Sequence, residues 1–179
     1  MRLLAISGSL RRGSYNSALL AVAEAARPSG VEFVTWRGLA EIPAFDEDLD
    51  LPLVVTALQR EIAQADAVLF ATPEYNGSFP GALKNALDWV SRPFATNVLR
   101  NKPVAVVGAS KGLFGAAWAQ SDLRKVLSRI GASVDDRELL VGSAHEQFAA
   151  GPQLRDPRLA VRLRAIVDGL AAGTARRAA

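Results

Sequence analysis

The first residues that could do chemistry lie in SGSLRRGSYNS, the stretch from Ser7 to Ser17. It places hydroxyl, amide and guanidinium side chains between a short apolar run and an Ala/Leu-rich run. Two common nucleotide motifs do not fit. Gly8 and Gly13 have the wrong spacing for GxGxxG, and Ser14 stands where a P-loop carries its lysine. The stretch therefore offers many hydrogen-bond donors without either of these signatures.

These donors favour a phosphate ligand. A helix N-terminus has unpaired N–H groups and a partial positive charge, and Arg11 can add a charge-assisted hydrogen bond to a phosphate oxygen. In a simpler interpretation, Ser14 or Asn16 only caps the helix, but that explains one polar residue and not the whole set. We expect the stretch to wrap a phosphate monoester. Arg12 is either a surface residue or a contact for a second anion.

A second polar stretch, TPEYNGSFPGALKNALDWVSRP, runs from Thr72 to Pro93. Pro73 stiffens its start, and Tyr75, Asn76 and Gly77 are predicted to form a tight turn. Glycine in that turn lets the backbone come close to a flat ligand. A third stretch, GASKGLFGA from Gly108 to Ala116, is also rich in glycine and small polar residues.

Alternating apolar runs and helical patterns must position these stretches. The predicted strands are Arg2–Ile6, Val31–Trp36 near an edge, Ala67–Ala71, Pro103–Gly108 and a kinked fifth strand in Ala132–Val134 and Glu138–Val141. The predicted helices are Asn16–Ala26, Leu53–Gln64, Ser78–Val90, Gly115–Arg129 and Asp156–Leu170.

Strands separated by helices run parallel, because each crossover returns the chain to the same end of the sheet. This order predicts an α/β fold, a three-layer sandwich around a five-stranded parallel sheet, built as one domain over residues 1–179. The tail Ala171–Ala179 is expected to fray. The three polar stretches all follow strand ends, so they should meet at the carboxyl edge of the sheet, where such folds bind ligands.

Composition narrows the chemistry. The 179 residues include no cysteine and one histidine, His145, so disulfides, thiol nucleophiles and cysteine-based metal sites are excluded, and we expect no metal centre. The formal net charge is +3, but the basic residues are scattered, which argues against nucleic acid as a partner. No apolar run approaches the roughly 18 residues of a membrane span. We expect a cytoplasmic protein with no membrane partner.

The motifs SGSLRRGSYN and PEYNGSFPGALKNALDW resemble those of the flavodoxin-like NAD(P)H-dependent FMN reductases, in particular the chromate/quinone reductase branch. The resemblance covers roughly Met1 to Gly169. It implies strand order 2-1-3-4-5 and bound FMN. By position, the 5′-phosphate would be held by Ser9, Arg11, Ser14, Asn16 and Ser17. The isoalloxazine would be lined by Pro73, Glu74, Tyr75, Asn76 and Gly77, and by Ser110, Lys111 and Gly112.

The same resemblance implies an oxidoreductase in which NADPH or NADH reduces FMN, and FMN reduces a small acceptor such as a quinone, chromate or free flavin. The chemistry would belong to the cofactor, so no side chain is assigned as catalytic. Family members are commonly dimers or tetramers, and we expect a homodimer or homotetramer. Two alternatives remain open, a flavodoxin-type electron carrier and an FMN-bound sensor without its own substrate site.

Overall fold

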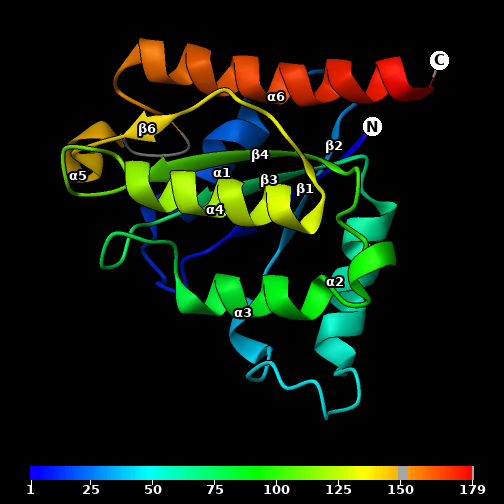
Figure 1. Cartoon of the computed structure of the whole chain (residues 1–179). Coiled ribbons are helices and arrows are strands. Elements are labelled where there is room, and N and C mark those ends of the chain that lie inside the picture. The colour runs from blue at the N-terminus through cyan, green and yellow to red at the C-terminus, as the bar shows by residue number, and fades with distance from the viewer. Residues whose placement is uncertain (149–152, 179) are drawn as a thin grey trace.

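The computed structural model describes residues 1–148 and 153–178, and Figure 1 shows the arrangement of the chain. Its strands are β1 (Arg2–Ser7), β2 (Glu32–Trp36), β3 (Ala67–Thr72), β4 (Pro103–Ala109), β5 (Ser133–Val134) and β6 (Leu140–Val141). Its α-helices are α1 (Tyr15–Ala25), α2 (Leu53–Gln64), α3 (Gly81–Val90), α4 (Ala117–Ile130), α5 (Ala144–Gln147) and α6 (Pro157–Ala178). Short 3₁₀ turns are η1 (Gly38–Glu41) and η2 (Phe94–Thr96).

All the pairings in this sheet are parallel, and the strand order is β2-β1-β3-β4-β5. The predicted order 2-1-3-4-5 and the edge position of the second strand are confirmed. β3 is buried at every position, as expected for a strand with helices on both faces. The carboxyl ends of the strands lie at the left in Figure 1, and both labelled chain ends lie at the opposite edge.

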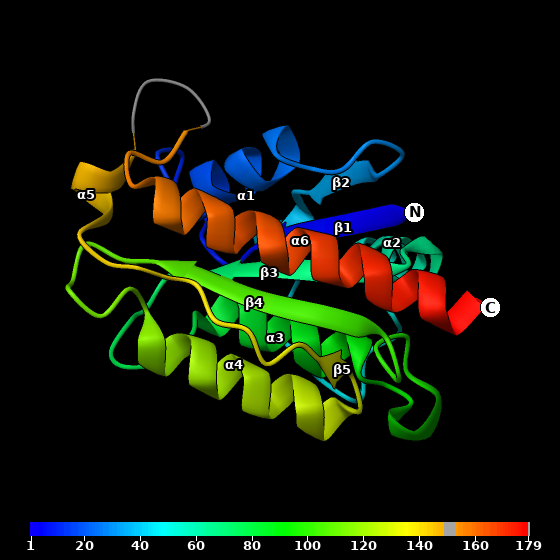
Figure 2. The same ribbon diagram turned by 90° about the horizontal axis from the view of Figure 1, so that it is seen from above.

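Two apolar clusters lie on the two faces of the sheet. Residues of α1 and α6 belong to one cluster, and residues of α2, α3 and α4 belong to the other. Figure 2, seen from above, shows α1 and α6 on one side of the central strands and α3 and α4 on the other. The three-layer sandwich predicted from the alternation of elements is therefore confirmed.

The fifth strand is split in the structure. β5 and β6 each pair with β4, and the backbone between them leaves the sheet. Side chains of α4 donate hydrogen bonds to backbone carbonyls around this gap. Arg124 Nη2 donates to the carbonyls of Val106 in β4 and of Arg137 at 2.9 and 2.6 Å, and Arg124 Nη1 donates to the carbonyl of Asp135. Gln120 Nε2 donates to the carbonyl of Leu139 at 3.0 Å. The kink expected in the fifth strand is therefore a break between β5 and β6, and side chains of α4 bond the backbone carbonyls around it.

Two helices differ from their predicted bounds by three residues or more, α3 and α6. α3 begins at Gly81 rather than Ser78. Ser78 pairs with Tyr75 across a tight turn, and Pro80 takes the N-cap position of the helix. α6 continues to Ala178, so the expected helix end at Leu170 is wrong for the residues that the structure describes, and the fraying expected after it stays a prediction. Ala179 lies outside those residues. The short helix α5 was not predicted.

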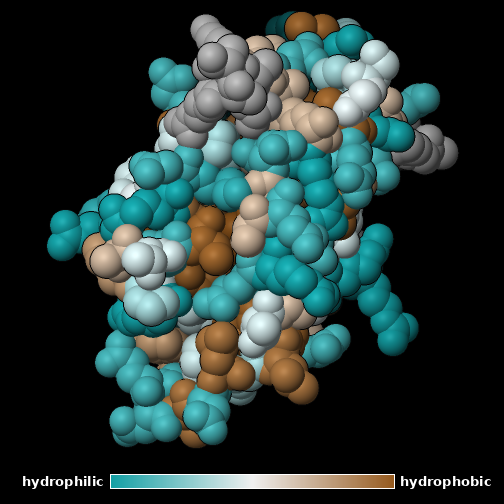
Figure 3. Space-filling view, turned by 90° about the vertical axis from the view of Figure 1, so that its right-hand side faces the viewer, coloured by the Kyte–Doolittle hydropathy of each residue, from teal (hydrophilic) through white to brown (hydrophobic). Residues whose placement is uncertain are grey.

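The surface is mixed in character. On the face seen in Figure 3, hydrophilic side chains predominate, and hydrophobic ones gather in a central patch and at the lower end. None of the helices described here has the length and apolar character needed to cross a bilayer.

Arg124→Ala should lower the free energy of unfolding by about 3 kcal/mol, because three carbonyls around the gap lose a charged donor. Urea denaturation followed by circular dichroism measures this. Lys125→Ala, at an exposed position on the same helix, is the control and should change stability by less than about 0.5 kcal/mol. Equal stability of the two variants would contradict the bridging role.

Candidate active site at the carboxyl edge of the sheet

The three polar loops meet in one cavity of about 200 Å³ at the carboxyl edge of the sheet. They follow β1, β3 and β4, as the sequence predicts. The lining residues are Ser9, Arg11, Ser14, Tyr15, Asn16, Pro73, Glu74, Tyr75, Ala109, Ser110 and Lys111. Segments about a hundred residues apart in the sequence therefore share one site.

Loop 1, the chain from Gly8 to Ser14, feeds directly into α1. The hydroxyl of Ser14 caps this helix by accepting from the N–H groups of Asn16 and Ser17 at 3.2 and 3.3 Å. The backbone N–H groups of Arg12, Gly13 and Tyr15 make no hydrogen bond with any residue that the structure describes. Unpaired N–H groups at a helix N-terminus suit an anion.

Asn16 joins the first and third loops. Its Nδ2 donates to the carbonyl of Ala109 at 3.0 Å, and its Oδ1 accepts from the N–H of Ala109 at 2.9 Å. The side chain is buried, so these two bonds replace water that it would otherwise hold. One Nδ2 hydrogen remains for a ligand in the cavity.

Loop 2 contains a tight turn from Tyr75 to Ser78. The two ends exchange backbone hydrogen bonds of 2.9 and 3.2 Å. Between them Asn76 and Gly77 have φ values of 53° and 78°. Positive φ at both central residues defines the turn that favours Asn-Gly, so the local sequence dictates this geometry.

Two polar side chains attach this turn to α4. The carboxylate of Glu74 accepts from the backbone N–H groups of Trp118 and Ala119 at 3.1 and 3.2 Å. The hydroxyl of Ser78 donates to Asp122 at 2.8 Å. Ala116, at the cap position of α4, supplies no side-chain cap of its own. Glu74 therefore caps this helix from another loop, and a carboxylate is favoured there by the helix dipole.

Loop 3, from Ser110 to Ala116, is held by the chain around β6. Ser110 N–H donates to the carbonyl of Val141 at 3.0 Å, and Ser143 N–H donates to the carbonyl of Gly112 at 3.1 Å. A Cβ at Gly142 would lie 2.1 Å from the carbonyl oxygen of Leu113, so only glycine fits. This close backbone approach keeps the third loop beside the other two.

Nine of the thirteen predicted site residues line the cavity: Ser9, Arg11, Ser14, Asn16, Pro73, Glu74, Tyr75, Ser110 and Lys111. The other four, Ser17, Asn76, Gly77 and Gly112, do not. Ser17 instead donates its hydroxyl to Ser7 Oγ at 3.2 Å and lines a neighbouring cavity.

Tyr15 and Ala109 were missed. Tyr15 stacks on Phe148 with ring centroids 5.6 Å apart. An aromatic residue directly after the cap was a possible signal for Tyr15. Nothing in the sequence marked Ala109.

The donor set fits a ligand with an anionic end and a flat end. At one end, Arg11 and the free N–H groups of the α1 terminus provide positive charge and donors. At the other end, the turn of loop 2 and the backbone of loop 3 leave a surface with half-exposed Tyr75 beside it. FMN has this shape, with a phosphate monoester at one end and a planar ring at the other. The residues present therefore fit FMN.

A parallel sheet in order 2-1-3-4-5 with a ligand cavity at the carboxyl ends of its central strands defines a flavodoxin-like mononucleotide-binding protein. The family model described as NADPH-dependent FMN reductase matches residues 1–146. The chain belongs to this family. It is an oxidoreductase that depends on FMN and NAD(P)H.

Comparisons with individual proteins agree. An NAD(P)H-dependent FMN reductase of Pseudomonas aeruginosa is 43% identical over 162 residues, which cover 88% of this chain and 86% of the relative. A quinone reductase of Escherichia coli is 37% identical over 146 residues, covering 79% and 77%. The solved structure of FerB, a flavoenzyme NAD(P)H:(acceptor) oxidoreductase from Paracoccus denitrificans, superposes with a TM-score of 0.89 at 35% identity, covering 98% of this chain and 97% of that one.

Glu74→Ala should lower the free energy of unfolding by about 1 kcal/mol, because α4 loses its cap. Glu74→Gln should lose less, since an amide oxygen can still accept from the same N–H groups. Thermal and urea denaturation of the apoprotein measure both. Glu41→Ala, at an exposed position, is the control. A Glu74→Ala variant as stable as the wild type would show that this carboxylate does not hold the helix.

Proposed function

We propose that the cavity at the carboxyl edge holds FMN and that the protein uses it to pass reducing equivalents from NAD(P)H to quinone-type acceptors. The observation that carries this proposal is the single cavity that combines the donors of the α1 terminus with the turn of loop 2. Family membership and the quinone reductases among the relatives support it.

At the phosphate end, we assign Ser9, Arg11, Ser14, Asn16 and Ser17. Arg11 supplies the charge, and Ser14 and Asn16 act largely by holding the helix terminus in place. Ser17 lines the neighbouring cavity, where its hydroxyl donates to Ser7 Oγ. Its hydroxyl can turn from Ser7 to a phosphate oxygen with little movement of the backbone.

At the ring end, we assign the backbone of loop 2 through Pro73, Glu74, Tyr75, Asn76 and Gly77. Loop 3 adds Ser110, Lys111 and Gly112. The clamps from Glu74 and Ser78 to α4 fix the turn, so its N–H groups are directed before a ligand arrives. Fixed donors cost no reorganisation when negative charge develops on a ligand.

FMN, when bound, supplies the two-electron chemistry that takes reducing equivalents from NAD(P)H and gives them to an acceptor. The chain itself binds, orients and leaves one side of the site accessible. Lys111 is exposed at the rim of the cavity and offers a positive charge to an anionic substrate or product. No side chain is assigned to a proton transfer, and positioning is the main contribution of the protein.

The proposal extends to finer points. Chromate and free flavin are further candidate acceptors. A homodimer or homotetramer is supported by Leu113, Phe114 and Trp118, apolar side chains of loop 3 and the start of α4 that are 81%, 62% and 51% exposed. Residues 1–179 act as one FMN-binding domain, supported by the single sheet with both apolar clusters on it. A cytoplasmic location follows from the need for a pool of reduced pyridine nucleotide.

Arg11→Ala should weaken FMN binding about 10- to 100-fold, because a charged hydrogen-bond partner of the phosphate is lost. Calorimetry of the apoprotein with FMN measures this. Circular dichroism should be unchanged, since Arg11 is exposed and supports no element. Arg60→Ala, an exposed arginine on α2, is the matched control. Unchanged FMN affinity in Arg11→Ala would overturn the phosphate assignment.

The purified protein loaded with FMN should lose its visible flavin absorbance when NADPH or NADH is added without a partner protein. Adding a benzoquinone should restore the absorbance, with equal amounts of nucleotide and quinone consumed. Stopped-flow absorbance and steady-state kinetics follow both halves. A flavin that stays oxidised with both nucleotides would instead indicate an electron carrier.

A further inference from the structure

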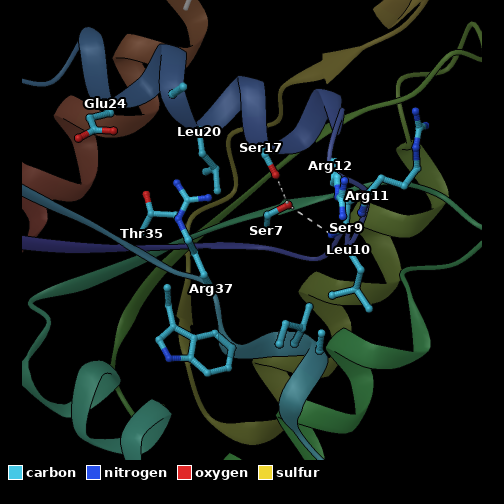
Figure 4. A pocket seen from close by; sticks show the side chains of 14 residues that line it. Ser7, Ser9, Leu10, Arg11, Arg12, Ser17, Leu20, Glu24, Thr35 and Arg37 are labelled. Atoms are coloured by element: carbon cyan, nitrogen blue, oxygen red, sulfur yellow. Dashed lines mark hydrogen bonds between the residues drawn. The ribbon is translucent and has the colours of Figure 1, made fainter. Parts of the chain in front are cut away.

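A second cavity, of about 310 Å³, lies on the other side of loop 1, between α1 and the end of β2. It shares Ser9 and Arg11 with the FMN cavity. Figure 4 shows Arg37 reaching in from the end of β2, Arg11 and Arg12 on the side of loop 1, and the hydroxyls of Ser7 and Ser17 between them. The two cavities are therefore neighbours along the same edge of the sheet.

The charge of this second cavity is not balanced. Arg11, Arg12 and Arg37 line it, and Glu24 is the one carboxylate among the lining residues. The guanidinium groups of all three arginines make no hydrogen bond or ion pair with any residue that the structure describes. Like charges gathered around a cavity repel one another, and an anion in the cavity removes that repulsion.

Two arginines elsewhere in the chain are paired. Arg92 pairs with Glu47 at 3.1 Å and lies over the ring of Phe45, 5.4 Å from its centroid. Arg124 is bonded to three carbonyls at the split strand. Arg60 and Arg129, exposed on other helices, also make no side-chain hydrogen bond with the described residues, so what distinguishes Arg12 and Arg37 is that they line one cavity together.

The location of the cavity indicates which anion it takes. In doubly wound α/β proteins that bind dinucleotides, the loop after the first strand holds phosphate groups, and an arginine near the end of the second strand can accommodate a ribose 2′-phosphate. Arg37 directly follows β2, and Arg12 lies in the loop after β1. β2 is two strand spacings, about 10 Å, from β3. An extended dinucleotide can span from this cavity to the ring end of the FMN site.

We propose that Arg12 and Arg37 bind the 2′-phosphate of NADPH, and that this cavity makes the protein prefer NADPH over NADH. The inference rests on the proposed function, since it names the pyridine nucleotide of that reaction. The two guanidinium groups come from different elements and approach from two sides of the cavity, which suits the tetrahedral phosphate. Leu10 and Leu20 give the cavity an apolar wall.

Steady-state kinetics of the FMN-loaded protein test the inference. Arg12→Ala and Arg37→Ala should each raise the KM for NADPH about 10-fold, whereas the KM for NADH should change by less than about twofold. Arg60→Ala, exposed on α2 and away from both cavities, is the control. Equal changes for both nucleotides, or no change, would overturn the inference.

Direct binding gives a readout that needs no turnover. Calorimetry of the FMN-loaded protein should show 2′,5′-ADP binding at least about 10-fold more tightly than 5′-AMP. Arg37→Ala should remove that difference. If 2′,5′-ADP and 5′-AMP bind with equal affinity, or neither binds, the cavity does not recognise a 2′-phosphate.

The two proposals fail in different ways. If wild-type protein does not bind FMN or oxidise either nucleotide, the proposed function fails, and 2′,5′-ADP binding to the apoprotein still decides the role of the cavity. If wild-type protein is reduced by both nucleotides with equal KM values and the arginine variants behave like it, only the assignment of Arg12 and Arg37 fails.

Discussion

The hydrogen-bonded pair between Asn16 and the backbone of Ala109 is the interaction on which the site depends most directly. It joins residues 93 positions apart in the chain, and it connects the first turn of α1 to the end of β4. β1 and β4 are not neighbours in the sheet, because β3 lies between them. This link adds a directed contact to the apolar packing of α1 against β4. A buried amide with both of its groups paired holds them at a defined separation.

Side chains also bond backbone groups at other places where a helix or strand ends. Glu74 caps α4 from the loop after β3, and Arg124 and Gln120 bond the carbonyls left by the gap between β5 and β6. Each replaces a backbone partner that secondary structure does not supply. All of these contacts link elements around the carboxyl edge or the strand that supports loop 3. The site is therefore stiff although it is built largely from loops.

Positively charged side chains line two neighbouring cavities at the same edge. In our proposals, one uses the N-terminus of α1 and Arg11, and the other uses Arg12 and Arg37; Ser9 and Arg11 line both cavities. A flavin mononucleotide and a phosphorylated dinucleotide both carry negative charge, so binding them side by side requires positive charge close to each. The arginines of loop 1 and the end of β2 meet this requirement without forming a long basic stripe on the surface.

The sequence by itself determined the layers, the parallel direction of the strands, the meeting of three loops at one edge, and the FMN reductase family. Local signals carried the layers, the strand direction and the loops: apolar runs of strand length, helical spacing, the Ser14 cap and the Asn76-Gly77 turn. Most predicted strand and helix bounds agree within three residues for this reason. The family came instead from the resemblance of two long motifs, SGSLRRGSYN and PEYNGSFPGALKNALDW. Only the tertiary structure decided that Asn16 faces Ala109, that Glu74 caps α4, that the fifth strand is interrupted and that Arg37 and Arg12 line one cavity. Each of these depends on two segments far apart in the chain whose separation is set by packing, and no local pattern encodes that separation.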